Sequence, residues 1–377
     1  MRRGRYDGIV TNTKVRWHAN SLAWACSRRV EEVQNLVMNR NLRRGLSRIE
    51  WVVVIFIGLV MATLILPALL RNRESARRNT CDSRLTDVGL TTLFVTDLQP
   101  GKHFSGYANE QGVDAAGQRA KTGWQFELLP FLSRPAAANA DSSPEDGPPD
   151  PLMLLPGPDV FGPRQKFYEA YGPTGPAETR GKTPEFYIPE FICPDDPRSR
   201  HDKRQAWTSY VANCGMPDKV NKKFPPDWPA NGVFLEQYGN RDPAVFTSPQ
   251  SVEDHDGSAY TLLLSENLDA GLWTDSDEAK NGFLWAPGNA EGNHTPECPV
   301  LFINQERGRG DGSVRFARPS SEHEGGVMAI FCDGRTKFIN QRIDFRIYCS
   351  WMTPDGQNAK QPGSDELLKP PYREVRE

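Results

Sequence analysis

The sequence predicts an α+β fold in which a long N-terminal helix packs on a twisted antiparallel β-sheet with long loops. Three observations lead to this prediction. Residues 51–70 contain no charged side chain and are almost wholly apolar, which favours one long helix. Short runs rich in β-branched and aromatic residues follow in the second half of the chain, as is typical of strands. Proline and glycine are frequent between these runs, at 31 and 32 residues, and both residues favour turns and loops.

The apolar stretch at 51–70 predicts a membrane-spanning helix. A helix of this length rises roughly 30 Å, about the thickness of the hydrocarbon core of a bilayer. An ordinary secretory signal has a shorter apolar region that ends at a small-residue cleavage site, whereas this stretch runs on into an arginine-rich segment of helical character. An uncleaved single-pass anchor is an alternative. Because arginines flank both ends of the stretch, the distribution of positive charge gives almost no preference for the orientation of the helix in the membrane.

Further elements are expected along the rest of the chain. The first helix should continue to residues 99–101, where Pro100 ends it,. A second, short helix with an aromatic anchor is predicted at 123–132. The abundance of prolines, small residues and acids at 133–190 predicts a surface loop region. Residues 351–377 are expected to form a polar C-terminal tail.

Several strands are expected after the loop region, at 209–213, 232–235, 259–264, 327–332 and 335–339,. Asp333-Gly334 separates the last two runs and predicts a hairpin with a two-residue turn. That turn would pair Ile330 with Lys337 and place Phe338 on the same face as Val327. The turn geometry by itself explains Asp333.

Composition and cysteine content restrict the class of protein. The net charge of −3 and the lack of an extended basic patch argue against a nucleic-acid partner. Cys26 lies in the basic N-terminal segment, and six further cysteines allow 15 pairings. In an oxidising compartment some of these six should form disulfides, the alternative being six buried thiols. No catalytic, cofactor or metal motif is present, so we expect no enzyme activity, no cofactor and no metal.

The stretch Arg43-Arg44-Gly45-Leu46-Ser47-Arg48-Ile49-Glu50-Trp51 resembles the cleavage and methylation site of type IV prepilins. The resemblance implies that residues 1–45 are a basic leader, that a prepilin peptidase cuts after Gly45, and that Leu46 becomes the methylated N-terminus. Glu50 would meet the N-terminus of a neighbouring subunit. Arg48 departs from the usual leucine. The leader is long, and Met38 offers a start that would give a leader of ordinary length.

A second resemblance covers the chain from Arg44 to about Trp351. The motifs ARRNTCDSRLTDVGL, GWQFELLPFL, FICPDD, SYVANCG, NGVF, DGSAYTLLLSE and SSEHEGGVMAIFCDGRTKFINQRID occur in this order in a prepilin-like domain-of-unknown-function family, number 1559. The family is known by a terminal H-x9-D-G signature, here His323, Asp333 and Gly334. The resemblance implies a pilin-like α+β domain at 100–350 after a helix at 46–99. It also favours a disulfide between Cys81 and Cys193, which both lie in matching motifs.

Cys214, Cys298, Cys332 and Cys349 are expected to form two further bridges of undecided pairing. For His323, the sequence favours a capping or hydrogen-bonding role in a loop, with ligand or metal binding as an alternative.

Together these features predict a non-catalytic, pilin-like or pseudopilin-like protein of the bacterial inner membrane. It would cross the membrane once, with the N-terminus cytoplasmic and the C-terminal domain outside, and its partners would be the prepilin peptidase and other pilin-like subunits. One rival is a membrane-tethered module that binds polysaccharide or protein through aromatic residues such as Trp228, Trp273 and Trp285. Another rival is a hydrolase built around His323, which would lose turnover on His323→Ala.

Overall fold

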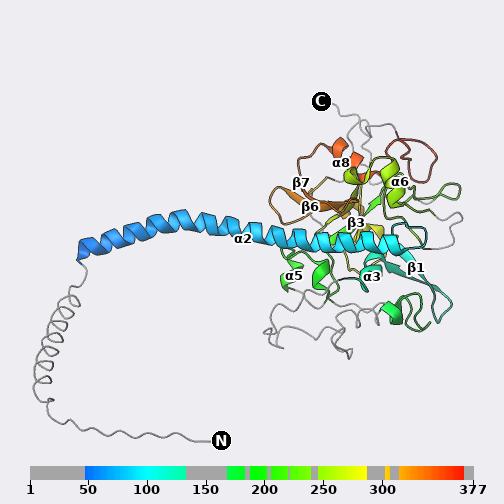
Figure 1. Cartoon of the computed structure of the whole chain (residues 1–377), viewed down its shortest axis with the longest axis horizontal. Helices are drawn as coiled ribbons and strands as arrows, with labels where there is room; N and C mark the ends of the chain where they lie inside the picture. Colours follow the sequence, from blue (N-terminus) through cyan, green and yellow to red (C-terminus); the bar gives the residue numbers. More distant parts are fainter. Residues whose placement is uncertain are drawn as a thin grey trace, which may run out of the picture. The chain divides into compact units, whose positions relative to one another are not determined.

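The computed structural model describes residues 47–132, 168–182, 187–201, 205–219, 221–238, 245–286, 302–305 and 314–368. The chain divides into two units, Met1–Arg71 and Asn72–Glu377. Figure 1 shows the course of the chain and the labels of the elements.

The helices of the described residues include α2 (Arg48–Leu98), α3 (Trp124–Leu128), α5 (Arg198–His201), α6 (Pro249–Asp254), α7 (Glu278–Asn281) and α8 (Phe345–Met352), with 3-10 turns η2 (Pro189–Phe191), η3 (Ser258–Tyr260) and η4 (Val314–Phe316). The strands are β1 (Ala108–Val113), β2 (Arg119–Gly123), β3 (Tyr210–Gly215), β4 (Leu262–Glu266), β5 (Gly282–Leu284), β6 (Gly326–Phe331) and β7 (Thr336–Asn340).

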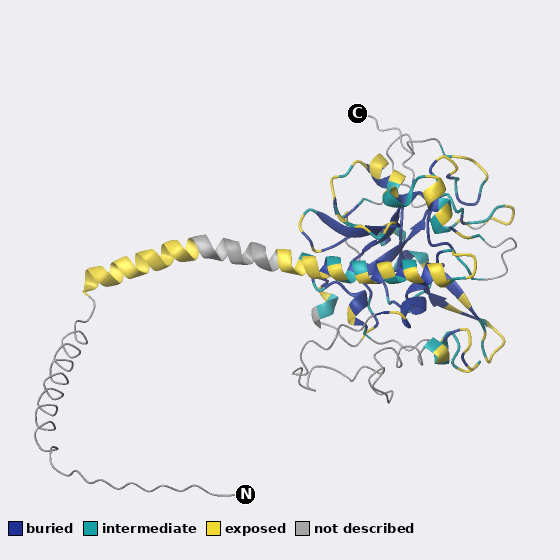
Figure 2. Cartoon of the chain, viewed as in Figure 1, coloured by how far each residue is buried: buried dark blue, intermediate teal, exposed yellow. Residues whose placement is uncertain are grey.

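In the first unit, α2 begins with a capping box. The amide of Ser47 donates to Oε2 of Glu50 at 2.6 Å, and the amide of Glu50 donates to Oγ of Ser47 at 3.3 Å, which satisfies two amides that the first helical turn leaves free. The apolar side chains that follow are exposed, from Ile49 at 76% to Met61 at 51%. Figure 2 shows this stretch in the exposed colour.

Across the described residues, no helix carries a segment both long enough and apolar enough to cross a membrane. The span predicted at 51–70 reaches into residues 64–70, whose side chains lie outside the described part. The membrane crossing therefore stays a prediction.

In the second unit, the remainder of α2 buries one side against the domain. Cys81, Leu85 and Val88 are fully buried, and Thr92 and Val95 nearly so. Their spacing of three and four residues places them on one face of the helix. The predicted end of the helix near residue 99 is confirmed, because α2 ends at Leu98.

The main sheet has five strands in the order β5-β3-β4-β6-β7. The expectation of a purely antiparallel sheet is wrong, because β5 runs parallel to β3 while the other pairs are antiparallel. The chain reverses once from β3 to β4 and again before β5, so β5 runs in the direction of β3 and extends its free edge. A separate antiparallel pair, β1-β2, lies near the end of α2 along the chain.

Each face of this sheet is covered by a different helix. One core cluster joins Leu85 and Val88 of α2 to Met328 and Ile330 of β6. The other joins Val327 of the same strand to α8, with the buried α8 side chains Phe345, Tyr348, Cys349 and Met352. The domain therefore has a helix on each side of the sheet, and Figure 2 shows the strands of the sheet largely in the buried colour.

The β6-β7 hairpin differs from its predicted register by one residue. Ile330 pairs with Thr336 rather than Lys337, and a three-residue loop replaces the two-residue turn. The amide of Phe331 donates to the carbonyl of Arg335 at 3.0 Å, and only Gly334 of the loop has positive φ, at 83°. A shift of one residue moves every side chain of a strand to the other face, so Phe338 packs in the cluster of α2 rather than with Val327.

The other strand predictions had mixed outcomes. The strand predicted at 209–213 is confirmed as β3, whereas 232–235 is not a strand. Both Val233 and Phe234 donate to the carbonyl of Asn213, so the segment meets β3 at one point instead of forming a ladder. The predicted second helix is confirmed as the shorter α3, and the indole of Trp124 anchors it by donating to the carbonyl of Asn281 at 3.0 Å.

Candidate functional site

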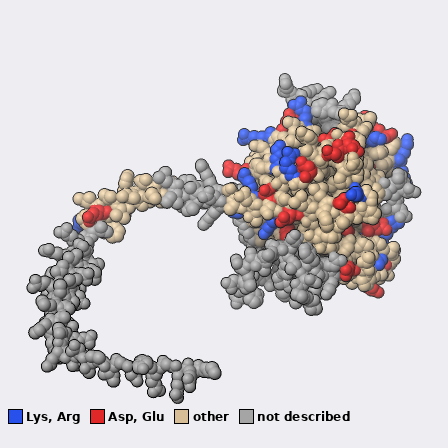
Figure 3. Space-filling model, viewed as in Figure 1, with Lys and Arg blue, Asp and Glu red and all other residues tan. Residues whose placement is uncertain are grey.

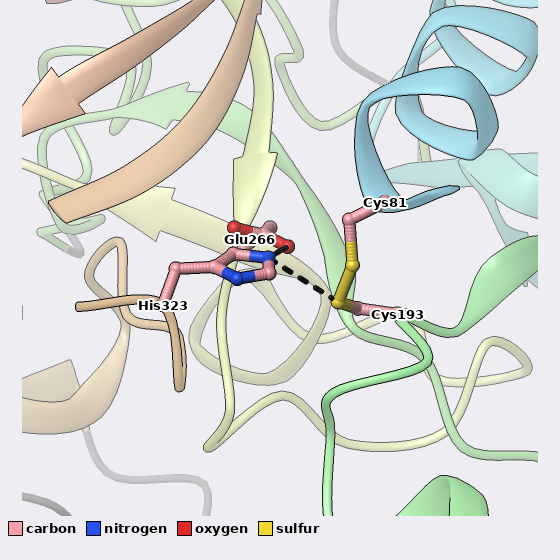
Figure 4. Close-up of side chains that lie close together, drawn as sticks. All are labelled: Cys81, Cys193, Glu266 and His323. Atoms are coloured by element: carbon pink, nitrogen blue, oxygen red, sulfur yellow. Dashed lines mark hydrogen bonds and ion pairs between the residues drawn. A yellow bond between two sulfur atoms is a disulfide. The ribbon is translucent and has the colours of Figure 1, made fainter. Parts of the chain in front are cut away.

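Four buried side chains from distant parts of the sequence meet beside α2. They are Cys81 of α2, Cys193 just after η2, Glu266 at the end of β4 and His323 shortly before β6, and each is at most 3% exposed. We call them the Cys–His–Glu cluster. Their sulfur, oxygen and nitrogen atoms all lie within 4.8 Å of one another, and Figure 4 shows the imidazole facing the two cysteines and Glu266.

Cys81 and Cys193 form a disulfide, as the family resemblance led us to expect. Their Cα atoms are 5.1 Å apart, inside the range of ordinary disulfides. Of the other described cysteines, Cys214, Cys332 and Cys349 are buried and form no disulfide with one another, so the predicted bridges among these three are wrong. Burial raises the pKa of the thiols of Cys214 and Cys332. Cys298 lies outside the described residues.

Further contacts hold α2 to the segment around Cys193. The guanidinium of Arg84 donates to the carbonyl of Ile192 at 2.7 Å, and Nε of Arg77 pairs with Oδ1 of Asp195 at 3.1 Å. The hydroxyl of Tyr210, on β3, donates to the carbonyl of Cys81 at 3.3 Å. The disulfide is thus one of several connections between the helix and the domain.

His323 lies between two buried carboxylates. Its Nδ1 is 3.3 Å from Oδ2 of Asp195, and its Nε2 is 3.4 Å from Oε1 of Glu266. Nε2 is also 3.7 Å from Sγ of Cys193. Because the ring is only 2% exposed, His323 faces these groups instead of solvent, which disfavours direct contact with a substrate.

Strand pairing positions Glu266, and the local turn positions His323. The other oxygen of Glu266, Oε2, accepts the amide of Met328 at 2.8 Å across the β4-β6 pair. The amide of His323 donates to Oγ of Ser321 at 3.1 Å, and that hydroxyl donates to the carbonyl of Gly326. Gly325 has a φ of 83°, a conformation that glycine adopts without steric cost, and its turn leads the chain from the imidazole into β6.

The remaining residues proposed from the sequence lie elsewhere. Asp333 and Gly334 are at the tip of the β6-β7 hairpin, where the amide of Arg335 donates to Oδ1 of Asp333 at 2.9 Å. A side chain at position 334 would meet Leu90 of α2 at 3.0 Å. The histidine of the signature therefore lies in the Cys–His–Glu cluster, whereas its Asp-Gly pair forms the tip of the β6-β7 hairpin. Glu50 is the capping-box residue of α2, and Gly45 and Leu46 lie outside the described residues.

Sequence reasoning missed Glu266 and Asp195 as members of this site. Both lie inside the quoted motifs, Glu266 as the last residue of DGSAYTLLLSE and Asp195 two positions after Cys193 in FICPDD. An acid that ends an otherwise apolar strand, and acids directly after a cysteine, were the available signals. These signals were not enough to place either acid in the site, because only the tertiary pairing of β4 with β6 brings Glu266 to His323.

A cleft of about 290 Å³ lies elsewhere on the domain, next to β1 and α3. Glu127 of α3 lines it and accepts hydrogen bonds from Gln111 and from the hydroxyl of Tyr168, both at 2.7 Å. Burial raises the pKa of Glu127, and these two hydrogen bonds partly oppose the rise. The cleft contains further carboxylates, on Glu110 and Glu236.

Glu127 is expected to make the domain less stable as the pH rises. The pKa of Glu127 is higher in the folded domain than in the unfolded chain. Its contribution to the free energy of unfolding is therefore complete at pH values below the unfolded pKa, and it is lost as the pH rises past the folded pKa. Relative to Glu127→Gln, the wild type should lose free energy of unfolding above about pH 4.5, by at most about 1.4 kcal/mol per pH unit. Urea unfolding at several pH values measures this difference. A difference that stays constant with pH would contradict the assignment.

These features define a class of chain, namely an α+β domain that is disulfide-bonded to a long N-terminal helix beside a buried carboxylate–histidine pair. The chain belongs to the DUF1559 family (SBP_bac_10), described as a protein of unknown function, which matches residues 71–346. No curated protein and no solved structure matches the chain at a significant level.

Proposed function

We propose that this chain is a non-catalytic, pilin-like or pseudopilin-like subunit of the bacterial cell envelope. A prepilin peptidase would cut after Gly45. The helix would then lie in the inner membrane, with the domain outside, until it assembles with other pilin-like subunits. The observation that carries this proposal is the single helix α2, Arg48–Leu98, with exposed apolar side chains near its beginning and a buried face from Cys81 onward.

The exposed apolar side chains need a non-aqueous environment. Eleven of the thirteen positions from Ile49 to Met61 are exposed large hydrophobic residues, the exceptions being Glu50 and Gly58. At about 25 cal/mol per Å² of apolar surface, removing such a stretch from water is strongly favourable. A bilayer and, later, the apolar helices of neighbouring subunits would both provide that environment.

The connections between α2 and the domain support a structural role. The disulfide, the Arg84–Ile192 hydrogen bond and the Arg77–Asp195 ion pair fix the end of the helix that lies in the second unit. When a subunit is assembled through its helix, the domain must stay firmly attached to that helix. Lysines, arginines and acids are interspersed on the face of this unit visible in Figure 3.

Glu50 distinguishes assembly from simple capping. In the capping box its carboxylate accepts the amide of Ser47, and glutamine can take the same role. In a filament, the carboxylate would pair with the terminal amine of a neighbour, for which a negative charge is required. Glu50→Gln therefore keeps the cap and removes the charge, whereas Glu50→Ala removes both.

We expect Glu50→Gln to insert into the envelope normally but to co-assemble poorly. Leaving a buried charge without its partner costs about 3–5 kcal/mol, so recovery in sheared filament or pseudopilus fractions should fall more than about tenfold. Mass spectrometry of the N-terminus should find methylated Leu46 in the wild type and so separates processing from assembly. An intact sequence through Gly45, or normal assembly of Glu50→Gln, would contradict the proposal.

A membrane-tethered binding module is the second candidate, and the cleft beside Glu127 favours it. Of the tryptophans considered for binding, Trp273 and Trp285 are fully buried core residues, so they do not form an exposed aromatic site. A ligand would instead meet the carboxylates of the cleft together with Phe246, whose ring stacks on His103. Such a module should tolerate Glu50→Gln and keep its ligand, unlike an assembling subunit.

A further inference from the structure

We propose that the Cys–His–Glu cluster binds one Zn²⁺ when the Cys81–Cys193 disulfide is reduced, with Cys81, Cys193, Glu266 and His323 as its four ligands. This inference is independent of the proposed function. It assigns two states to one site: a disulfide under oxidising conditions and a closed metal centre under reducing conditions.

The spacing of the ligand atoms already fits a tetrahedral zinc centre. With metal–ligand distances of about 2.0–2.3 Å, neighbouring ligand atoms of a tetrahedron are separated by about 3.3–3.8 Å. Nε2 of His323 lies 3.4 Å from Oε1 of Glu266 and 3.7 Å from Sγ of Cys193. These two edges need almost no adjustment. The other pairs of ligand atoms lie within 4.8 Å of one another, and the two sulfurs must separate to about 3.8 Å once they are no longer bonded.

The surrounding hydrogen bonds orient these atoms as metal ligands. A metal-bound histidine usually donates its other ring N–H to a carboxylate, which fixes the tautomer. Asp195 provides that carboxylate, 3.3 Å from Nδ1 of His323, and Arg77 pairs with its other oxygen. With the proton on Nδ1, the lone pair of Nε2 points toward Glu266 and the cysteines.

Glu266 has one oxygen held by the protein and one oxygen available. Oε2 accepts the amide of Met328, whereas Oε1 is buried and, within the described part of the chain, accepts no hydrogen bond. An unsatisfied buried carboxylate oxygen is costly. Oε1 of Glu266 faces the lone pair of Nε2 of His323, and two such acceptors need either a proton or a metal ion between them. Zinc would satisfy both atoms at once.

The exchange between the two states balances chemically. A dithiol reductant supplies two electrons and two protons to the disulfide and becomes a disulfide itself, which leaves two thiols at positions 81 and 193. Binding of Zn²⁺ then releases those two protons to solvent, because thiolates are the ligands. Two thiolates, one imidazole and one carboxylate are a donor set that suits zinc. The disulfide connects α2 to the segment before β3, whereas the zinc centre would also connect α2 to β4 and to the segment before β6.

The test is a cobalt titration of the full-length chain in detergent, after anaerobic reduction. Co²⁺ replaces Zn²⁺ and reports its ligands by colour. We expect one equivalent to bind, with a thiolate-to-cobalt charge-transfer band and intense visible bands of tetrahedral cobalt, both abolished by added Zn²⁺. The oxidised chain should give neither band. If reduction unfolds the chain, the same bands should appear together with recovery of the circular dichroism spectrum.

Matched variants locate the site. Cys81→Ser combined with Cys193→Ser should remove the charge-transfer band, whereas Cys332→Ser, a buried thiol outside the cluster, should leave it unchanged. Asp195→Asn should weaken metal affinity by about 10–100-fold while the tetrahedral spectrum is retained at saturation. The proposal is overturned if the reduced chain binds no cobalt, if the band survives the double serine variant, or if the oxidised chain binds equally well.

Discussion

The variant with both Cys81→Ser and Cys193→Ser is expected to unfold far more easily than the wild type. The disulfide closes a loop with a sequence separation of 112 residues. A cross-link over roughly 100 residues removes unfolded-state entropy worth about 4.7 kcal/mol, and native disulfides usually contribute about 2–5 kcal/mol. We therefore expect the free energy of unfolding to fall by about 4 kcal/mol, measured by urea denaturation without added metal.

Reductant provides the control for this measurement. A reducing agent, with a chelator present, should destabilise the wild type to about the level of the double variant and leave the double variant unaffected. Cys332→Ser, which removes a free thiol, should remain sensitive to reductant. Equal denaturation midpoints for the wild type and the double variant would show that the bond does not stabilise the domain.

The second large effect is expected at the buried ion pair of Arg318 and Asp269. Their side chains are 1% and 4% exposed, and Nη1 of Arg318 is 3.2 Å from Oδ2 of Asp269. The guanidinium also donates to the carbonyl of Gln305 at 2.6 Å. Arg318→Met keeps most of the volume but leaves the carboxylate of Asp269 buried without this partner, which costs about 3–5 kcal/mol. Chemical denaturation measures the loss.

Two further variants test the cause of that loss. Adding Asp269→Leu to Arg318→Met removes the stranded charge and should recover much of the lost stability, because apolar replacement of a whole buried pair is often neutral. Arg346→Met, in an exposed pair with Asp344 at 2.8 Å, should cost less than about 1 kcal/mol. If the double variant is no more stable than Arg318→Met alone, packing and not charge explains the effect.

Local signals in the sequence predicted the long helix and most strands of the sheet. The helical period in α2 and the apolar runs of β3, β4 and β6 are properties of neighbouring residues. The three-residue strand β5 was missed because it is too short to carry a pattern. The hairpin register was wrong because Asp-Gly is compatible with both two-residue and three-residue loops, and the packing of Phe338 beside α2 is a tertiary effect.

The candidate site was predictable only in part. The family resemblance correctly paired Cys81 with Cys193 and singled out His323. The resemblance gave no reason to connect His323 with the disulfide, because the H-x9-D-G signature contains neither Cys81 nor Cys193. Strand pairing brings Glu266 into the cluster, and the loop after η2 brings Asp195 to His323. Neither contact can be predicted from spacing in the sequence.

All five strands of the main sheet follow Cys193 in the chain, since β3 begins at Tyr210. The loop that the disulfide closes therefore contains no strand of that sheet. The entropy of closing a loop changes only with the logarithm of its length, so an insertion of about 20 residues there would cost only about 0.1–0.2 kcal/mol. Between the two cysteines, and outside α2, β1, β2 and α3, changes in chain length would therefore leave the main sheet and its helix almost unaffected.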